Sequence, residues 1–229
     1  MGPEVRVGIQ MIIGRIIRGQ RFRAEQAGFT LVEISLVVII SLILAAIAIP
    51  SLLTAIRLAH LRGAASDYSG LLEQARIYAV RDNKYYATYI LAPVGSAAVA
   101  QAYVDLSKNG GTAVVTGDPS ITIESDVVQE AVGSAPNTND LKNQLLPAIT
   151  PVTPTDSSVT APTFGPRGLP CTPLTLSGTT SIICDNSGGP TAFWTFLENT
   201  QSSSWQAVTI TPAGRIQRWY NNGSTWSKL

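Results

Sequence analysis

The chain has 229 residues, a formal net charge of +1 and a mean hydropathy of +0.19. Residues 1–28 hold five arginines against two glutamates, a charge of +3, so residues 29–229 carry −2. This balance argues against a protein that coats nucleic acid, because it provides no overall basic field. A single histidine, with no nucleophile elbow and no phosphate-binding glycine loop, argues against an enzyme and predicts no cofactor and no metal.

An uncharged apolar stretch from Ile34 to Ile56 is the first predicted element. At about 1.5 Å per residue, such a helix spans the roughly 30 Å hydrocarbon core of a bilayer. Arginines 15, 18, 21 and 23 precede it, whereas only Arg57 and Arg62 follow it closely. Positive charge favours the cytoplasmic side, so we expect the N-terminus in the cytoplasm and the rest of the chain beyond Ile56 to be exported.

A carboxylate, Glu33, directly precedes this stretch. A charged side chain costs about 2.5–3.5 kcal/mol at the centre of a membrane helix and less towards its end, so it normally has a partner. The apolar run supplies none. A cut after Gly28 would leave a positive amine on Phe29, one helical turn away, and this amine could pair with Glu33 of a neighbouring subunit.

The segment GFTLVEISLVVIISLILAAIAIP, which begins at Gly28, resembles the class III signal of type IV pilins and pseudopilins. The resemblance implies that a prepilin peptidase cleaves between Gly28 and Phe29 and methylates the new N-terminus of Phe29. It also implies that Glu33 guides the subunit into a filament whose core is built from such helices. Residues 1–28 would then be a leader peptide, and 29–56 a transmembrane and assembly helix.

Two other interpretations of the apolar run are open. A secretory signal peptide would use it as its hydrophobic region, with a cleavage site at Ala46–Ala48, and a plain single-pass anchor would keep it uncleaved. Neither accounts for Glu33 or for the sequence Gly-Phe-Thr just before the apolar run. Met11 is an alternative start, which would shorten the leader to residues 11–28.

After Pro50, apolar residues recur every three or four positions, which predicts one helix from Phe29 to about Val80. These residues are Leu58, Leu61, Ala65, Tyr68, Leu72, Ala75 and Ala79. The second half of the helix is therefore expected to pack on the exported domain. Pro50 removes one intrahelical hydrogen bond, and we expect a bend there.

Short β-prone runs separated by turn residues follow the helix. They are 85–91, 98–106, 112–116, 120–125, 181–184, 192–197, 205–211 and 215–220. Pro212–Gly214 should join the last two as a hairpin, because Pro presets the second position of a type I turn and Gly can adopt a positive φ. Residues 134–173, rich in Pro, Ser and Thr, are predicted to be a long exposed loop.

The predicted fold class is α+β, with a long N-terminal helix, transmembrane in its first half, packed on a C-terminal antiparallel sheet domain at 57–229. This is the pilin architecture that the resemblance implies. The segments TFGPRGLPC, Thr163 to Cys171, and AVTITPAGRIQRWY, Ala207 to Tyr220, resemble the GspH/FimT type of minor pseudopilin. The sheet order is left open.

In FimT-type minor pilins, a Gly-Arg-x-Arg element on the final hairpin is associated with DNA binding. The resemblance makes Arg215 and Arg218 candidate phosphate contacts, with Lys228 and Trp219 as further candidates. The second arginine comes one residue later here than in the family pattern. In a regular strand Gln217 shares the face of Arg215, and Arg218 falls on the other face.

Cys171 and Cys184 are the only cysteines, and in an oxidising compartment such a pair predicts a disulfide. The loop that it closes is typically worth about 3 kcal/mol. The run CDNSGG, Cys184 to Gly189, could form either a small calcium loop or a simple turn, and the turn is favoured because the ligands are few.

The expected function is that of a non-enzymatic minor pilin or pseudopilin. Its expected partners are other pilin or pseudopilin subunits, a prepilin peptidase and an inner-membrane assembly platform. We expect a single-pass inner-membrane precursor with its C-terminal domain in the periplasm, which then enters a pilus or pseudopilus. Two alternatives are open: a DNA-binding minor pilin for DNA uptake, and a type II secretion pseudopilin that contacts exported proteins.

Overall fold

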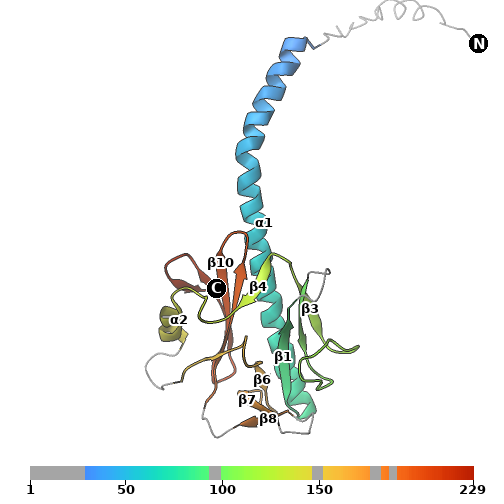
Figure 1. Cartoon of the computed structure of the whole chain (residues 1–229), viewed down its shortest axis with the longest axis vertical. Helices are drawn as coiled ribbons and strands as arrows, with labels where there is room; N and C mark the ends of the chain where they lie inside the picture. Colours follow the sequence, from blue (N-terminus) through green and yellow to red (C-terminus); the bar gives the residue numbers. More distant parts are fainter. Residues whose placement is uncertain (1–28, 93–98, 146–151, 176–181, 186–189) are drawn as a thin grey trace, which may run out of the picture. The chain divides into compact units, whose positions relative to one another are not determined.

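The computed structural model describes residues 29–92, 99–145, 152–175, 182–185 and 190–229 (Figure 1). Residues 1–28, which hold the predicted leader and Gly28 of the predicted cleavage site, lie outside these ranges. The chain divides into two compact parts, residues 1–47 and 48–229. The described portion of the first part is the beginning of helix α1, Leu31–Asp82, which runs without interruption through Pro50. The prediction of one long helix is confirmed.

Within residues 48–229, α1 buries one face. The buried residues recur at the three-and-four spacing of a helical stripe: Leu61, Ala64, Ala65, Tyr68, Leu71, Leu72, Ala75 and Ala79. The helix ends in a Schellman motif, in which the amide of Lys84 donates to the carbonyl of Ala79 and the amide of Asn83 to that of Val80. Asn83 adopts the left-handed conformation that this motif needs, with φ +52°.

One sheet has the strand order β3-β2-β1-β6-β7-β8, and each neighbouring pair is antiparallel. Its strands are β1 (Tyr86–Leu91), β2 (Ala100–Val104), β3 (Ser120–Ile123), β6 (Thr163–Phe164), β7 (Pro170–Thr175) and β8 (Ile182–Asp185). The disulfide between Cys171 and Cys184, with the two Cα atoms 5.5 Å apart, joins β7 to β8 as predicted.

The other sheet has the order β12-β11-β10-β9-β4, and short β5 pairs in parallel with β9. Its strands are β4 (Val127–Glu130), β5 (Thr155–Asp156), β9 (Phe193–Asn199), β10 (Ser204–Ile210), β11 (Ile216–Asn221) and β12 (Trp226–Lys228). A second helix, α2 (Thr138–Leu145), packs on this sheet through Leu141 and Leu145.

The second sheet is buried on both faces. One face meets α1, where Phe193, Leu197, Val208 and Ile210 join the main core together with residues of the first sheet. On the other face, α2 covers a separate core that includes three tryptophans: Leu141, Leu145, Trp194, Phe196, Ala207, Trp219 and Trp226. We call this face of the second sheet the α2 face.

Two matching turns, Gly165–Gly168 and Thr211–Gly214, lie against each other. Each has Pro second and Gly last, and in each the amide of the last residue donates to the carbonyl of the first, at 2.8 Å. Both end glycines have positive φ, +70° at Gly168 and +76° at Gly214. A Cβ on Gly214 would lie 2.7 Å from the carbonyl oxygen of Gly168. The two segments that carry the second family resemblance therefore meet at their turns.

Two sequence predictions were wrong. Residues 112–116 are not a strand, because the amide of Val115 donates to the Asp118 carboxylate, which holds this stretch in a loop. Residues 134–173 are not one long exposed loop, since their described part contains α2, β5, β6 and the start of β7. The other predicted strands are present with shifted ends, and β4 and β12 were missed.

We predict that Gly214→Ala destabilises the domain more than Gly110→Ala. Both glycines have nearly the same φ, +76° and +77°. Each substitution should therefore lower the free energy of unfolding by about 1–2 kcal/mol, because alanine is strained in the left-handed conformation. Only Gly214 adds a backbone clash, because nothing lies within 4 Å of a Cβ on Gly110. Urea unfolding of the full chain in detergent micelles, followed by tryptophan fluorescence, measures both. Equal losses would show that the two turns do not touch.

Candidate functional site

The start of α1 is capped by Thr30. The amide of Glu33 donates to the Thr30 hydroxyl oxygen at 3.2 Å, which satisfies one of the free amides at the helix start. Thr30-Leu31-Val32-Glu33 is also the pattern of a capping box, in which the Glu side chain can reach back to the cap residue. Sequence reasoning missed the Thr30 cap, although the Thr-x-x-Glu spacing was visible.

The following stretch of α1 is exposed and apolar. An 18-residue window within it has a mean hydropathy of 2.9 and buries none of its residues, so by length and composition this helix could cross a membrane. Its four hydroxyl side chains each donate to a carbonyl three or four residues earlier: Ser35 to Val32, Ser41 to Val37, Ser51 to Ala48 and Thr54 to Pro50. The helix therefore leaves no free hydroxyl hydrogen in this stretch, as an apolar solvent requires.

A polar cluster follows directly, where α1 meets the second sheet. The His60 ring nitrogen Nδ1 lies 3.1 Å from both carboxylate oxygens of Asp126, in the turn between β3 and β4. The Asn199 amide donates to Asp126 at 2.7 Å and to the carbonyl of Arg57 at 3.3 Å. Burial raises the pKa of Asp126, but the hydrogen bonds from Asn199 and His60 outweigh it, and the pKa is lowered overall. Sequence reasoning missed this cluster, because its members are far apart in the chain.

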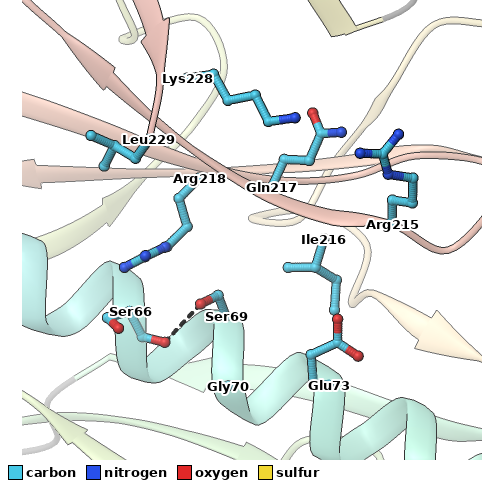
Figure 2. Close-up of a pocket in the computed structure, with 10 residues that line it drawn as sticks. All are labelled: Ser66, Ser69, Gly70, Glu73, Arg215, Ile216, Gln217, Arg218, Lys228 and Leu229. Atoms are coloured by element: carbon cyan, nitrogen blue, oxygen red, sulfur yellow. Dashed lines mark hydrogen bonds between the residues drawn. The ribbon is translucent and has the colours of Figure 1, made fainter.

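The final hairpin and α1 enclose a groove of about 370 Å³ (Figure 2). Its lining residues come from one stretch of α1 and from the two C-terminal strands with their preceding turn: Ser66, Ser69, Gly70, Glu73, Arg215, Ile216, Gln217, Arg218, Lys228 and Leu229. Arg218 and Ile216 point towards α1, whereas Arg215, Gln217 and Lys228 point away from it (Figure 2).

The two candidate arginines therefore project to opposite sides, in agreement with the strand geometry expected from the sequence. The pairing of β10 with β11 continues one residue at a time from Ile210–Ile216 to Trp205–Asn221. No bulge interrupts this ladder, so nothing brings Arg218 to the side of Arg215. Arg215 shares its side with Lys228 instead.

No group of three or more His, Cys, Asp or Glu side chains that could hold a metal occurs among the residues that the structure describes. The candidate calcium run after Cys184 falls mostly on residues 186–189, which are outside that set. No protein-family model, no curated protein and no solved structure matches the chain.

We predict that the chain binds duplex DNA weakly. Arg215 and Arg218 project to opposite sides of the hairpin, so the phosphates of one DNA strand cannot contact both. Phosphate contacts release counterions, so whatever binding occurs should fall steeply with salt. A DNA titration of the full chain in nonionic detergent at two salt concentrations, with Arg215→Ala and Arg218→Ala beside it, measures this. Tight, salt-sensitive binding that both variants abolish would contradict the prediction and favour a DNA receptor.

Proposed function

We propose that the chain is a pilin-like subunit, which is made as a membrane precursor and assembled through its N-terminal helix into a pilus or pseudopilus. The observation that carries the proposal is Glu33, a carboxylate at the head of an exposed apolar helix. The helix continues without a break into the core of a two-sheet domain. An apolar helix of this kind needs lipid or other helices around it, and its carboxylate needs a cation.

The cation would come from processing. Cleavage after Gly28 places a positive amine on Phe29, and the residues around this bond resemble the class III signal of type IV pilins. The carboxylate of Glu33 makes no ion pair with any residue in the described ranges. An amine that paired with Glu33 of its own chain would make no contact between subunits, whereas the amine of a neighbour would join each subunit to the next. Glu33 would thus select the position at which a new subunit enters.

A prepilin peptidase and an inner-membrane platform would be the partners in this process, with the N-terminus cytoplasmic before cleavage. The exported domain would be carried outside on the second half of α1. Its polar cluster around Asp126 ties the domain to the helix just beyond the apolar stretch. The proposal covers both a pilus and a type II secretion pseudopilus, since both use such subunits.

We predict that the mature chain begins at Phe29 and carries an N-methyl group. Mass spectrometry of the membrane or filament fraction identifies this N-terminus. Gly28→Val should block the cut, because the added side chain fills the position next to the cleaved bond, whereas Gly14→Val, far from that bond and present with either start, should leave it unchanged. An N-terminus at Ile49, after the alternative Ala46–Ala48 site, would refute the pilin-like function.

We further predict that Glu33→Gln abolishes assembly but leaves the chain inserted in the membrane. Glutamine also completes a capping box, so this variant removes the charge and keeps the cap. Thr30→Ala is the matched control, because it weakens the cap by about 1 kcal/mol and keeps the charge. Subunit assembly is measured by sedimentation after mild detergent extraction. Assembly that survives Glu33→Gln and fails in Thr30→Ala would reduce Glu33 to a capping residue.

A further inference from the structure

One row of side chains crosses the second sheet from edge to edge and ends in opposite charges. The strand pairings place Glu130 opposite Phe196, Phe196 opposite Ala207, Ala207 opposite Trp219, and Trp219 opposite Lys228. Directly paired residues lie on the same face, so all five belong to the α2 face. The three inner residues are buried in the second core. The two outer residues stand at the edges, on β4 and β12.

The β12 end of the row is cationic. Lys228 is exposed and projects away from α1, and exposed Arg215 projects to the same side (Figure 2). Neither of these two side chains makes an ion pair within the described ranges. We call Arg215 and Lys228 the basic edge. Its charge is available to a partner.

The β4 end of the row is acidic. Glu198 lies in the adjacent row, opposite Val128, and therefore on the same face as Glu130. Both glutamates are half-buried. Burial raises the pKa of Glu198, and the nearby charge of Glu130 raises it further. We call this pair the acidic edge. A cation placed beside it would relieve the repulsion between the two carboxylates.

The two edges cannot meet within one chain, because β12 and β4 are the opposite ends of the strand order. They can meet between two copies. A contact from the basic edge of one copy to the acidic edge of the next uses different surfaces on the two partners. It therefore leaves a free surface of each kind and can repeat along a row of subunits.

We propose that the exported domains of neighbouring subunits contact each other through these edges, with Lys228 and Arg215 of one copy beside Glu130 and Glu198 of the next. This inference rests on the proposed function, since it assumes that the helices assemble. Exposed ion pairs add little affinity, so the apolar helices would hold the subunits together and the charged edges would set which faces meet.

Zero-length coupling tests the contact. A glutamate carboxyl adds across the carbodiimide to give an O-acylisourea. The Lys228 amine then attacks its acyl carbon, the bond to the isourea oxygen breaks, and the products are the amide and a urea that carries the oxygen and hydrogens of the lost water. The full chain is used in the membrane fraction and in nonionic detergent, as a mixture of isotope-labelled and unlabelled copies. We expect a ladder of covalent oligomers in which mixed-isotope peptides join Lys228 to Glu130 or Glu198. Salt should weaken the coupling, because the charges of the basic edge are exposed.

Charge exchange distinguishes the contact from chance collision. Lys228→Glu should lower the coupling several-fold, and mixing this chain with a Glu130→Lys/Glu198→Lys chain should restore it through mixed pairs. Lys84→Glu, which changes a lysine in the turn after α1, should have no effect. Chains that sediment as assemblies without the Lys228 amide would overturn the edge contact and leave the proposed function in place. Chains that do not assemble at all would overturn both.

Discussion

Helix α1 is one continuous helix whose first half is exposed and apolar and whose second half packs in a domain core. The rest of the structure depends on this continuity. Between Ile34 and Ile56 its apolar side chains are exposed on all sides, and its hydroxyls are bonded to its own carbonyls. From Leu61 onwards one face is buried, and that face is the largest contribution of any single element to the main core. The polar cluster of His60, Asp126 and Asn199 lies where the exposed apolar stretch ends and the buried face begins. Truncating the helix at this cluster would therefore remove both the exposed apolar stretch and the contact of His60 with Asp126.

The two matched turns show how the two sheets are held in one domain. The turn ending at Gly168 belongs to the first sheet, and the turn ending at Gly214 belongs to the second. Each joins its strands by the same four-residue turn, with Pro second and a glycine of positive φ last. Their backbones are close enough that a side chain at Gly214 has no room. A contact between main-chain atoms fixes the distance between the turns more tightly than side chains could, since it cannot be repacked.

The sequence predicted the structure best where a single local pattern, such as a helical spacing of apolar residues or a turn motif, was sufficient. The stripe of α1, the Pro212–Gly214 hairpin and the cysteine pair needed only local reasoning, and the structure has all three. Helix α2 was missed because only Leu141 and Leu145 mark its apolar face, in a segment whose prolines favour a loop. Residues 112–116 look like a strand by composition, but carboxylates of Asp105 and Asp118 bond the backbone amides around them and compete with sheet pairing. The sheet order and the cluster at Asp126 depend on contacts between distant segments, which no local pattern carries.

Arg215 and Arg218 illustrate how one residue of spacing changes what a motif can do. In the register of β10 with β11, Arg218 pairs with buried Val208 and points towards α1, so its charge faces Ser66 and Ser69 in the groove. Arg215 remains outside with Lys228, at the far end of a row that begins with Glu130. A Gly-Arg-x-Arg spacing would place both arginines on one side and concentrate charge for a polyanion. The observed spacing instead divides the charge between a helix-facing groove and a sheet edge, and the edge is matched by carboxylates on the same chain. If the domains meet through these edges as proposed, Arg215 and Lys228 of the hairpin sheet would face carboxylates of a neighbouring subunit, whereas Arg218 would stay beside α1, so the two arginines would not act on one phosphate backbone.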